Sequence, residues 1–184
     1  MGQVTITADY SADSDIGTKD AAASDFVGFG ASTNFRMVQR FPLAALPSAA
    51  SVSKIELIFE IDFAGSGSDC RVGPYNANGQ ADPSADDATT LYSRCNVPGS
   101  GDDLYTTFGV TGTGVFTLNL TTPVVKADLL AAKLAVDRFS LGYRRATEGV
   151  SHFFASLSGD DDPTNPPKLR ITYGNSPGLF WNIV

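Results

Sequence analysis

Residues 55–63 read Ile-Glu-Leu-Ile-Phe-Glu-Ile-Asp-Phe, and this stretch decides the fold. Apolar side chains fill every second position, and acidic side chains fill most of the positions between them. Successive side chains of a strand point to opposite faces, so this period of two predicts a strand with a buried face and an acidic, solvated face. A sheet with one solvated side is typically antiparallel.

Shorter strand-like stretches extend in both directions from this strand, separated by turn-forming clusters of Gly, Pro, Asp, Asn and Ser. About nine strands are predicted, at residues 3–8, 35–43, 55–63, 70–75, 104–110, 115–120, 139–144, 150–157 and 169–173, and residues 26–29 are a short apolar stretch. One helix is predicted from Pro123 onward, with Thr122 as its cap. Its buried face combines residues at helical spacing: Val125, Leu129, Ala132 and Val136. We therefore expect an all-β fold, an antiparallel jelly-roll β-sandwich with one short helix.

The 184 residues suffice for one sizeable core, and no linker divides them into two core-sized halves. We expect a single β-sandwich domain over residues 1–174, followed by an apolar C-terminal tail over residues 175–184. Residues 9–25 and 76–103 are polar and contain no predicted strand. The second of these is a long excursion, and such a segment in a compact domain is usually functional or mobile.

The composition, 42% hydrophobic and 18% charged, is that of a globular chain. A net charge of −7 opposes contact with phosphate backbones, so a nucleic-acid partner is not expected. No stretch is long and apolar enough to span a membrane. No signal peptide is visible, so either a leader was removed or the protein does not use the secretory route. Cys70 and Cys95 either form one disulfide or remain two buried thiols, and the sequence leaves both open.

Three segments together resemble the DNRLRE-type extracellular β-sandwich family. Residues 36–61 (RMVQRFPLAALPSAASVSKIELIFEI) resemble its arginine, Phe-x-Leu strand, Leu-Pro turn and alternating strand. Residues 114–144 (GVFTLNLTTPVVKADLLAAKLAVDRFSLGYR) resemble its late strand, short helix and return strand. Residues 153–173 (FFASLSGDDDPTNPPKLRITY) resemble its closing loop and strand.

The resemblance spans residues 3–173 and consists of strand patterns rather than a catalytic signature. It implies a jelly-roll sandwich of extracellular bacterial proteins, with carbohydrate binding in some members. The family's tryptophan-bearing segment is missing, because residues 76–95 contain no Trp. That departure weakens the transfer of a ligand-binding surface.

No catalytic residues are predicted, and the protein is expected not to be an enzyme. The single histidine, His152, lies in a predicted strand among Val150, Phe153 and Phe154, and no nucleophile motif accompanies it. We interpret it as structural. The acids of residues 56–62 lie on a polar face, where nothing raises a pKa for acid–base catalysis.

Two acidic clusters are candidate calcium ligands, because calcium prefers several oxygen donors from flexible loops. Their members are Asp9, Asp13 and Asp15 in the first cluster, and Asp160, Asp161 and Asp162 in the second. The alternative is that they are solvated turn residues. No other cofactor is predicted.

Aromatic side chains near the long excursion are candidate sugar-stacking residues: Tyr75, Tyr92 and Tyr105. The alternative is that they belong to the sandwich core or to strand ends. A stacking face would fit a polysaccharide ligand.

The C-terminal segment carries the only Trp of the chain and is apolar. Its candidate docking residues are Leu179, Phe180, Trp181, Ile183 and Val184. Exposed to water, such a segment is an aggregation hazard, so we expect it to dock on its own sandwich or on a neighbouring subunit.

Two function classes follow. The first is a structural or decorating subunit of an extracellular assembly, such as a phage capsid-decoration or fibre protein. It would be a homo-oligomer on the virion surface. The second is a carbohydrate-binding or adhesion module of a secreted bacterial protein.

Overall fold

The computed structural model describes residues 1–15, 17–21, 24–30, 33–65, 69–99, 101, 104–146, 148 and 153–175. The strands are β1 (Gly2–Thr7), β2 (Tyr10–Ser14), β3 (Lys19–Asp20), β4 (Ser24–Gly30), β5 (Thr33–Pro42), β6 (Ala50–Ala64), β7 (Asp69–Pro74), β8 (Thr106–Gly109), β9 (Gly114–Asn119), β10 (Arg138–Arg145), β11 (Phe153–Ser158) and β12 (Lys168–Asn175). The helical elements are the short 3-10 turns η1 (Asn76–Asn78) and η2 (Pro83–Ala85) and the helices α1 (Ala88–Arg94) and α2 (Pro123–Ala135).

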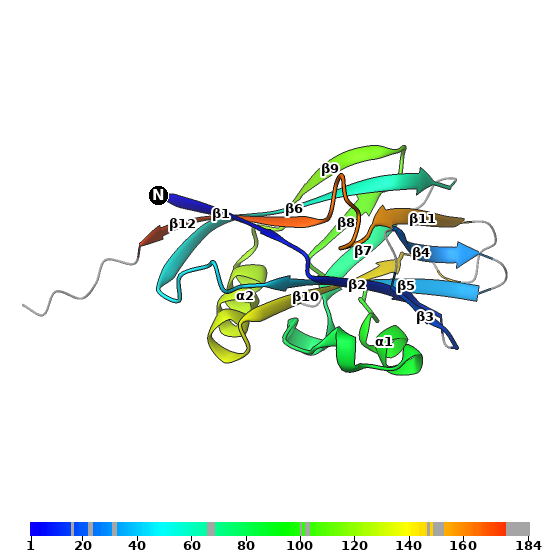
Figure 1. Cartoon of the computed structure of the whole chain (residues 1–184), viewed down its shortest axis with the longest axis horizontal. Helices are drawn as coiled ribbons and strands as arrows, with labels where there is room; N and C mark the ends of the chain where they lie inside the picture. The colour runs from blue at the N-terminus through cyan, green and yellow to red at the C-terminus, as the bar shows by residue number, and fades with distance from the viewer. Residues whose placement is uncertain are drawn as a thin grey trace, which may run out of the picture.

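Eight of the strands form two four-stranded antiparallel layers. The first sheet has the order β4-β11-β6-β9, and the second has the order β5-β10-β7-β8. The chain passes from one sheet to the other after every strand from β4 to β11 except between the neighbours β7 and β8, and these two strand orders are the jelly-roll arrangement. In the first sheet β12 also pairs with β6 and β1, and in the second β2 pairs with β5 and β3 (Figure 1). The predicted all-β antiparallel class is confirmed, with two α-helices where the sequence predicted one.

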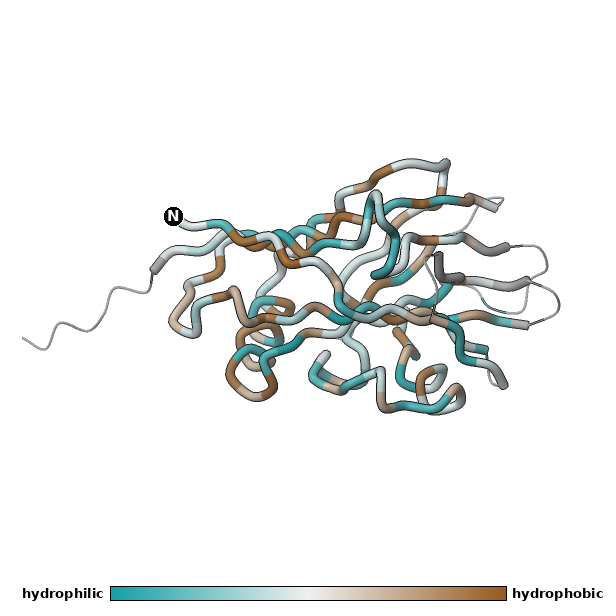
Figure 2. Tube along the Cα trace, in the orientation of Figure 1, coloured by the Kyte–Doolittle hydropathy of each residue, from teal (hydrophilic) through white to brown (hydrophobic). Residues whose placement is uncertain are grey.

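One hydrophobic core lies between the two sheets. Leu57 and Phe59 of β6 and Phe139 of β10 are buried in the same cluster. The Phe59 ring lies 5.1 Å from that of Phe108 on β8. Figure 2 shows hydrophobic segments gathered along the central strands. The predicted alternation holds from Ile55 to Ile61, whereas Phe63 is 49% exposed.

The acidic face of β6 is less solvated than the sequence predicted. Glu56 is only 7% exposed, because Lys54 and Arg170 both form ion pairs with it, at 2.7 and 2.9 Å. Hydrogen bonds from Arg170 and Lys54 lower the pKa of Glu56. This face of the first sheet is therefore held by ion pairs across neighbouring strands.

Helix α2 confirms the predicted helix. The Thr122 hydroxyl accepts a hydrogen bond from the Val125 N–H at 3.2 Å, and Pro123 occupies the first turn. Val125, Leu129 and Ala132 are buried against the core as the spacing predicted. The helix ends at Ala135, so Val136 follows it as the C-cap residue.

The predicted long excursion covered residues 76–103. In the structure residues 75–99 form a third layer on the outer face of the second sheet, and from here on we call these residues the excursion. The prediction of a long polar excursion missed η1, η2 and α1, which lie within it. Tyr75, Leu91 and Cys95 pack with Ala12 and Val38 in a second hydrophobic cluster. The second sheet is thus covered on both faces.

Close approach of the excursion to the sheet depends on a glycine of β10. A Cβ atom at Gly142 would lie 3.3 Å from the Cα of Cys95, so a side chain there would press against the excursion. The segment 9–25, predicted without strands, supplies β2, which pairs with β5, and β3, which pairs with β2. Among the described residues, no helix has the length and apolar character needed to cross a membrane.

Candidate functional site

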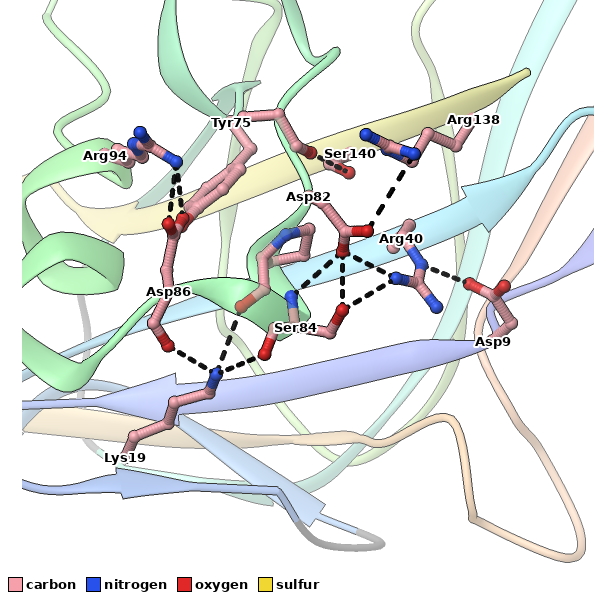
Figure 3. Close-up of polar contacts among 12 residues, drawn as sticks. Asp9, Lys19, Arg40, Tyr75, Asp82, Ser84, Asp86, Arg94, Arg138 and Ser140 are labelled. Carbon is pink, nitrogen blue, oxygen red and sulfur yellow. Dashed lines mark hydrogen bonds and ion pairs between the residues drawn. The ribbon is translucent and has the colours of Figure 1, made fainter. Parts of the chain in front are cut away.

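A network of charged side chains fastens η2 to the second sheet (Figure 3). Arg40 of β5 donates from Nε to Asp9 at 2.8 Å and from Nη1 to Asp82 at 2.6 Å. Asp82 also accepts hydrogen bonds from the backbone N–H and hydroxyl of Ser84, at 3.1 and 2.7 Å. Burial opposes ionisation of Asp82, but the hydrogen bonds from Ser84 and Arg40 outweigh it and lower the pKa. Asp82 therefore holds η2 as an anion.

The neighbouring part of the network holds the start of α1. Lys19 of β3 donates to the carbonyl oxygens of Pro83 and Asp86, at 3.1 and 2.7 Å. The Asp86 carboxylate accepts from Arg94 Nη1 at 2.8 and 2.7 Å, and from the Tyr75 hydroxyl. Burial, followed by this hydrogen bond, raises the pKa of Tyr75. Figure 3 shows Arg94 and Tyr75 converging on Asp86.

A second ion-pair group lies at the other end of the excursion. Glu148 accepts from Arg36 Nε and Nη2 at 2.8 and 2.9 Å, and Arg144 Nη2 lies 3.1 Å from it. Arg36 also stacks on the ring of Tyr92, 4.0 Å from its centroid. Burial opposes ionisation of Glu148, but the hydrogen bond and charge of Arg36 outweigh it and lower the pKa. These charged groups bind the excursion to the sheet through Arg36, which also donates to the Tyr92 carbonyl at 2.8 Å.

An open cleft of about 240 Å³ lies between the end of β7, η1 and the end of α1. Polar side chains at its surface are Asn76, Ser93, Arg94 and Asn96, and the apolar wall is formed by Pro74, Ala77, Val97 and Pro98. Asn76 has the left-handed φ of 57°, a conformation that asparagine tolerates better than most side chains. The Asn96 amide oxygen accepts a hydrogen bond from Arg144.

The chemistry of this cleft suits a small hydroxyl-rich ligand. Amides and a hydroxyl both donate and accept, which matches alcohol groups. Sequence reasoning missed these residues because their meeting depends on packing of the excursion. The Asn-Ala-Asn-Gly turn at residues 76–79 is a local signal that could have pointed to them.

The predicted aromatic stacking face is wrong for two of its three residues. Tyr75 is 0% exposed and Tyr105 is 5% exposed, so neither ring is available to a sugar. Tyr105 stacks on Phe139 and donates to Asp128 at 2.5 Å. Tyr92 is partly exposed, but its face is occupied by Arg36. Tyr75 is buried because the rest of the excursion packs over it on the second sheet.

The first predicted calcium cluster is not assembled as a ligand set. Asp9 forms the ion pair with Arg40, and Asp13 is buried in β2. Asp15 accepts from the backbone N–H groups of Gly17 and Thr18, at 2.7 and 2.6 Å, in its own turn. These three side chains therefore have separate structural roles.

The second predicted calcium cluster contributes one residue to an acidic group. Asp160 accepts from the backbone N–H and hydroxyl of Ser11, both at 2.8 Å, and Asp161 is exposed. Asp162 lies with Glu60 and Asp62 of β6, their ligand oxygens all within 4.8 Å of one another. We call these three residues the acidic group. They could hold a divalent cation, and the calcium prediction stays a prediction at this place.

The remaining predicted residues divide into two sets. Cys70 and Cys95 are both buried free thiols, so of the two alternatives that the sequence left open, the disulfide is not formed. His152 and the tail residues Leu179, Phe180, Trp181, Ile183 and Val184 lie outside the described residues.

Strand β1 forms one boundary of the first sheet. It pairs with β12 along its whole length, from Gly2 opposite Tyr173 to Thr7 opposite Lys168. In the part of the chain that the structure describes, no strand pairs with its other edge. β12 ends at Asn175, near the start of β1, and in the sequence three residues separate Asn175 from the apolar segment Leu179–Val184.

Comparison with known proteins gives no relative to guide the assignment. No family model matches the chain, and no curated protein matches its sequence. The resemblance to the DNRLRE-type family therefore stays a prediction.

Proposed function

We propose that this protein is a non-enzymatic structural subunit of an extracellular assembly, and that its copies associate through the apolar segment Leu179–Val184. A capsid-decoration or fibre protein on the surface of a phage virion is the form of assembly we favour. The observation that carries the proposal is the place where β12 ends. Asn175 lies near the start of β1, whose other edge has no described strand partner, and in the sequence the apolar segment follows after three residues.

The charged groups support a structural role rather than a catalytic one. Asp82 and Glu148 have lowered pKa values because arginines bind them, and the Tyr75 hydroxyl is bound to Asp86. A general acid or base needs a pKa near the working pH and access to a substrate. These groups instead fix the excursion to the second sheet.

The experiment compares the molar mass of the full chain with that of a chain ending at Asn175. That end point keeps all of β12, which reaches Asn175. We expect the full chain to form an oligomer and the shortened chain to be a monomer with the same circular dichroism spectrum. An unchanged oligomer in the shortened chain would overturn the proposal.

A second candidate function, carbohydrate binding, is favoured by the cleft at Asn76 and Asn96. Its neutral amides suit sugar hydroxyls, and its wall of Pro and Val side chains suits the apolar face of a sugar ring. This function also agrees with membership of the DNRLRE-type family, which we propose on the sequence resemblance alone.

The test is a polysaccharide array probed with the full chain and with Asn76→Gly. Glycine tolerates the left-handed backbone of that position and removes the whole side chain, including its amide. Binding by the full chain that is lost in Asn76→Gly supports a sugar site in the cleft. A blank array, or equal binding by both proteins, counts against it.

A further inference from the structure

We infer that the free edge of β1 accepts the apolar C-terminal segment of a second copy of this chain as an added antiparallel strand. The inference rests on the proposed function and deepens it, because it names both the partner and the surface. Three features of the first sheet carry it: the main-chain groups on the edge, its side chains, and the reach of the chain after β12.

The main-chain groups of β1 alternate between β12 and the free edge. The Ala8 N–H donates to the carbonyl of Pro167 at 2.9 Å, just before β12 begins. In an antiparallel ladder every second residue bonds to the same neighbour, so Val4 and Ile6 also face β12. The N–H and C=O groups of Gln3, Thr5 and Thr7 therefore point to the free edge. They form a template for another strand.

The side chains of β1 leave this template unprotected. Natural edge strands are commonly protected by lysines, prolines or bulges. β1 reads Gly-Gln-Val-Thr-Ile-Thr, with no charged residue and no proline. Its outward side chains Gln3, Thr5 and Thr7 are exposed, whereas Val4 and Ile6 face the core.

The sequence of the C-terminal segment fits beside these side chains. In an extended strand, Leu179, Trp181 and Ile183 share one face. Placed next to β1, this face would extend the apolar layer beyond Val4 and Ile6. Six residues, 179–184, also match the six residues of β1.

The reach of the chain favours a second copy over the chain's own segment. Every strand pair described is antiparallel, and a strand antiparallel to β1 must begin opposite Thr7. Tyr173 lies opposite Gly2 and Asn175 lies two residues beyond it, so Asn175 is about 24 Å from Thr7 along β1 and about 10 Å away across two strand spacings, which is about 26 Å in all. The four Cα–Cα steps from Asn175 to Leu179 span at most about 14 Å. The C-terminal segment therefore cannot reach the position opposite Thr7 on its own chain, whereas the segment of another copy can.

The experiment changes the free edge and keeps the C-terminal segment. Thr5→Pro removes an N–H from the free edge without removing a bond to β12, and proline is tolerated on edge strands. Thr5→Val is the matched control, because valine has nearly the same shape and keeps the N–H. We expect Thr5→Pro to be a monomer and Thr5→Val to assemble like the unchanged chain.

Amide hydrogen exchange provides a measurement that does not depend on the proline variant. A synthetic peptide of residues 176–184 is added to the chain ending at Asn175. We expect it to slow exchange at Gln3 and Thr5 by about tenfold or more, and to leave Val4, already bonded to β12, unchanged. Equal exchange with and without peptide would overturn the inference.

The outcomes separate this inference from the proposed function. If the chain ending at Asn175 is a monomer but Thr5→Pro still assembles, the segment drives assembly at another surface. In that case only the assignment of the β1 edge as its binding surface is wrong. If the shortened chain assembles unchanged, the proposed function itself fails. If the full chain stays monomeric while the amides of Gln3 and Thr5 are protected from hydrogen exchange, its own segment pairs with β1, and the inference that a second copy supplies the strand is wrong.

Discussion

Replacing Glu148 with glutamine removes the carboxylate that two arginines share beneath the excursion. Glu148 binds Arg36 through both oxygens and lies 3.1 Å from Arg144. The Arg36 side chain is only 8% exposed, and that of Glu148 is 15% exposed. Glutamine keeps the shape and one acceptor oxygen but leaves the buried guanidinium of Arg36 without a counter-charge.

The expected loss of stability is large for one substitution. Breaking a buried ion pair costs about 3–5 kcal/mol, and the retained amide oxygen puts Glu148→Gln near the lower end, at about 3 kcal/mol. For a chain of 184 residues, each kcal/mol shifts the Tm by about 2–4 °C, so a drop of about 6–12 °C is expected.

Thermal unfolding followed by circular dichroism measures this drop. The matched control is Asp137→Asn, which removes the ion pair with Lys133 where Asp137 is 52% exposed. Asp137 is largely solvated, and Lys133 keeps its hydrogen bond to the Leu43 carbonyl at 2.9 Å, so the control should lose at most about 1 kcal/mol, or about 4 °C. Equal Tm values for Glu148→Gln and the unchanged chain would refute the structural role of this ion pair.

Four further predictions concern other parts of the molecule. The folded state lowers the pKa of Glu148, so the stability that this carboxylate contributes is complete above its ordinary pKa of about 4.3 and is lost as the pH falls through the lowered pKa. The Tm of the unchanged chain should therefore fall on acidification, and that of Glu148→Gln should fall less. Gly79→Ala should destabilise by about 1–3 kcal/mol in urea unfolding, because φ is +70° and a Cβ would lie 2.7 Å from a buried phenylalanine ring. Burial raises the pKa of Cys70 to about 12 and also raises that of Cys95, so a thiol reagent should label both only after unfolding; labelling of the native chain would contradict their burial. Calcium binding by the acidic group predicts that added calcium raises the Tm of the unchanged chain and not that of Glu60→Gln; no rise in either would remove that site.

The strands that could be predicted are those with one solvated face. β6 shows period two because Ile55, Leu57 and Phe59 face the core while Lys54 and Glu60 face outward. Helix α2 was predictable because its cap and its buried face are local in sequence. Strand β2 escaped detection because its buried side chains are largely polar. Ser11 bonds to Asp160 and Ser14 bonds to the Ala88 carbonyl, and both partners are distant in the sequence.

The candidate sites were less predictable because they depend on contacts between distant residues. Tyr75 was expected at an exposed face, but its burial depends on Leu91 and Val38, which lie far from it in the chain. The carboxylates of Glu60 on β6 and Asp162 in the loop between β11 and β12 lie close together, although about a hundred residues separate them in the sequence. Sequence spacing alone grouped Asp162 with Asp160 and Asp161. The apolar C-terminal segment, in contrast, was evident from composition alone.

The measurement that tests the central claim most directly is the molar mass in solution of the full chain beside that of the chain ending at Asn175. The monomer has a mass of 19.3 kDa. Assembly through the C-terminal segment predicts a multiple of this mass for the full chain, and a folded monomer for the shortened one. The same mass state in both proteins, whether monomer or oligomer, would contradict it.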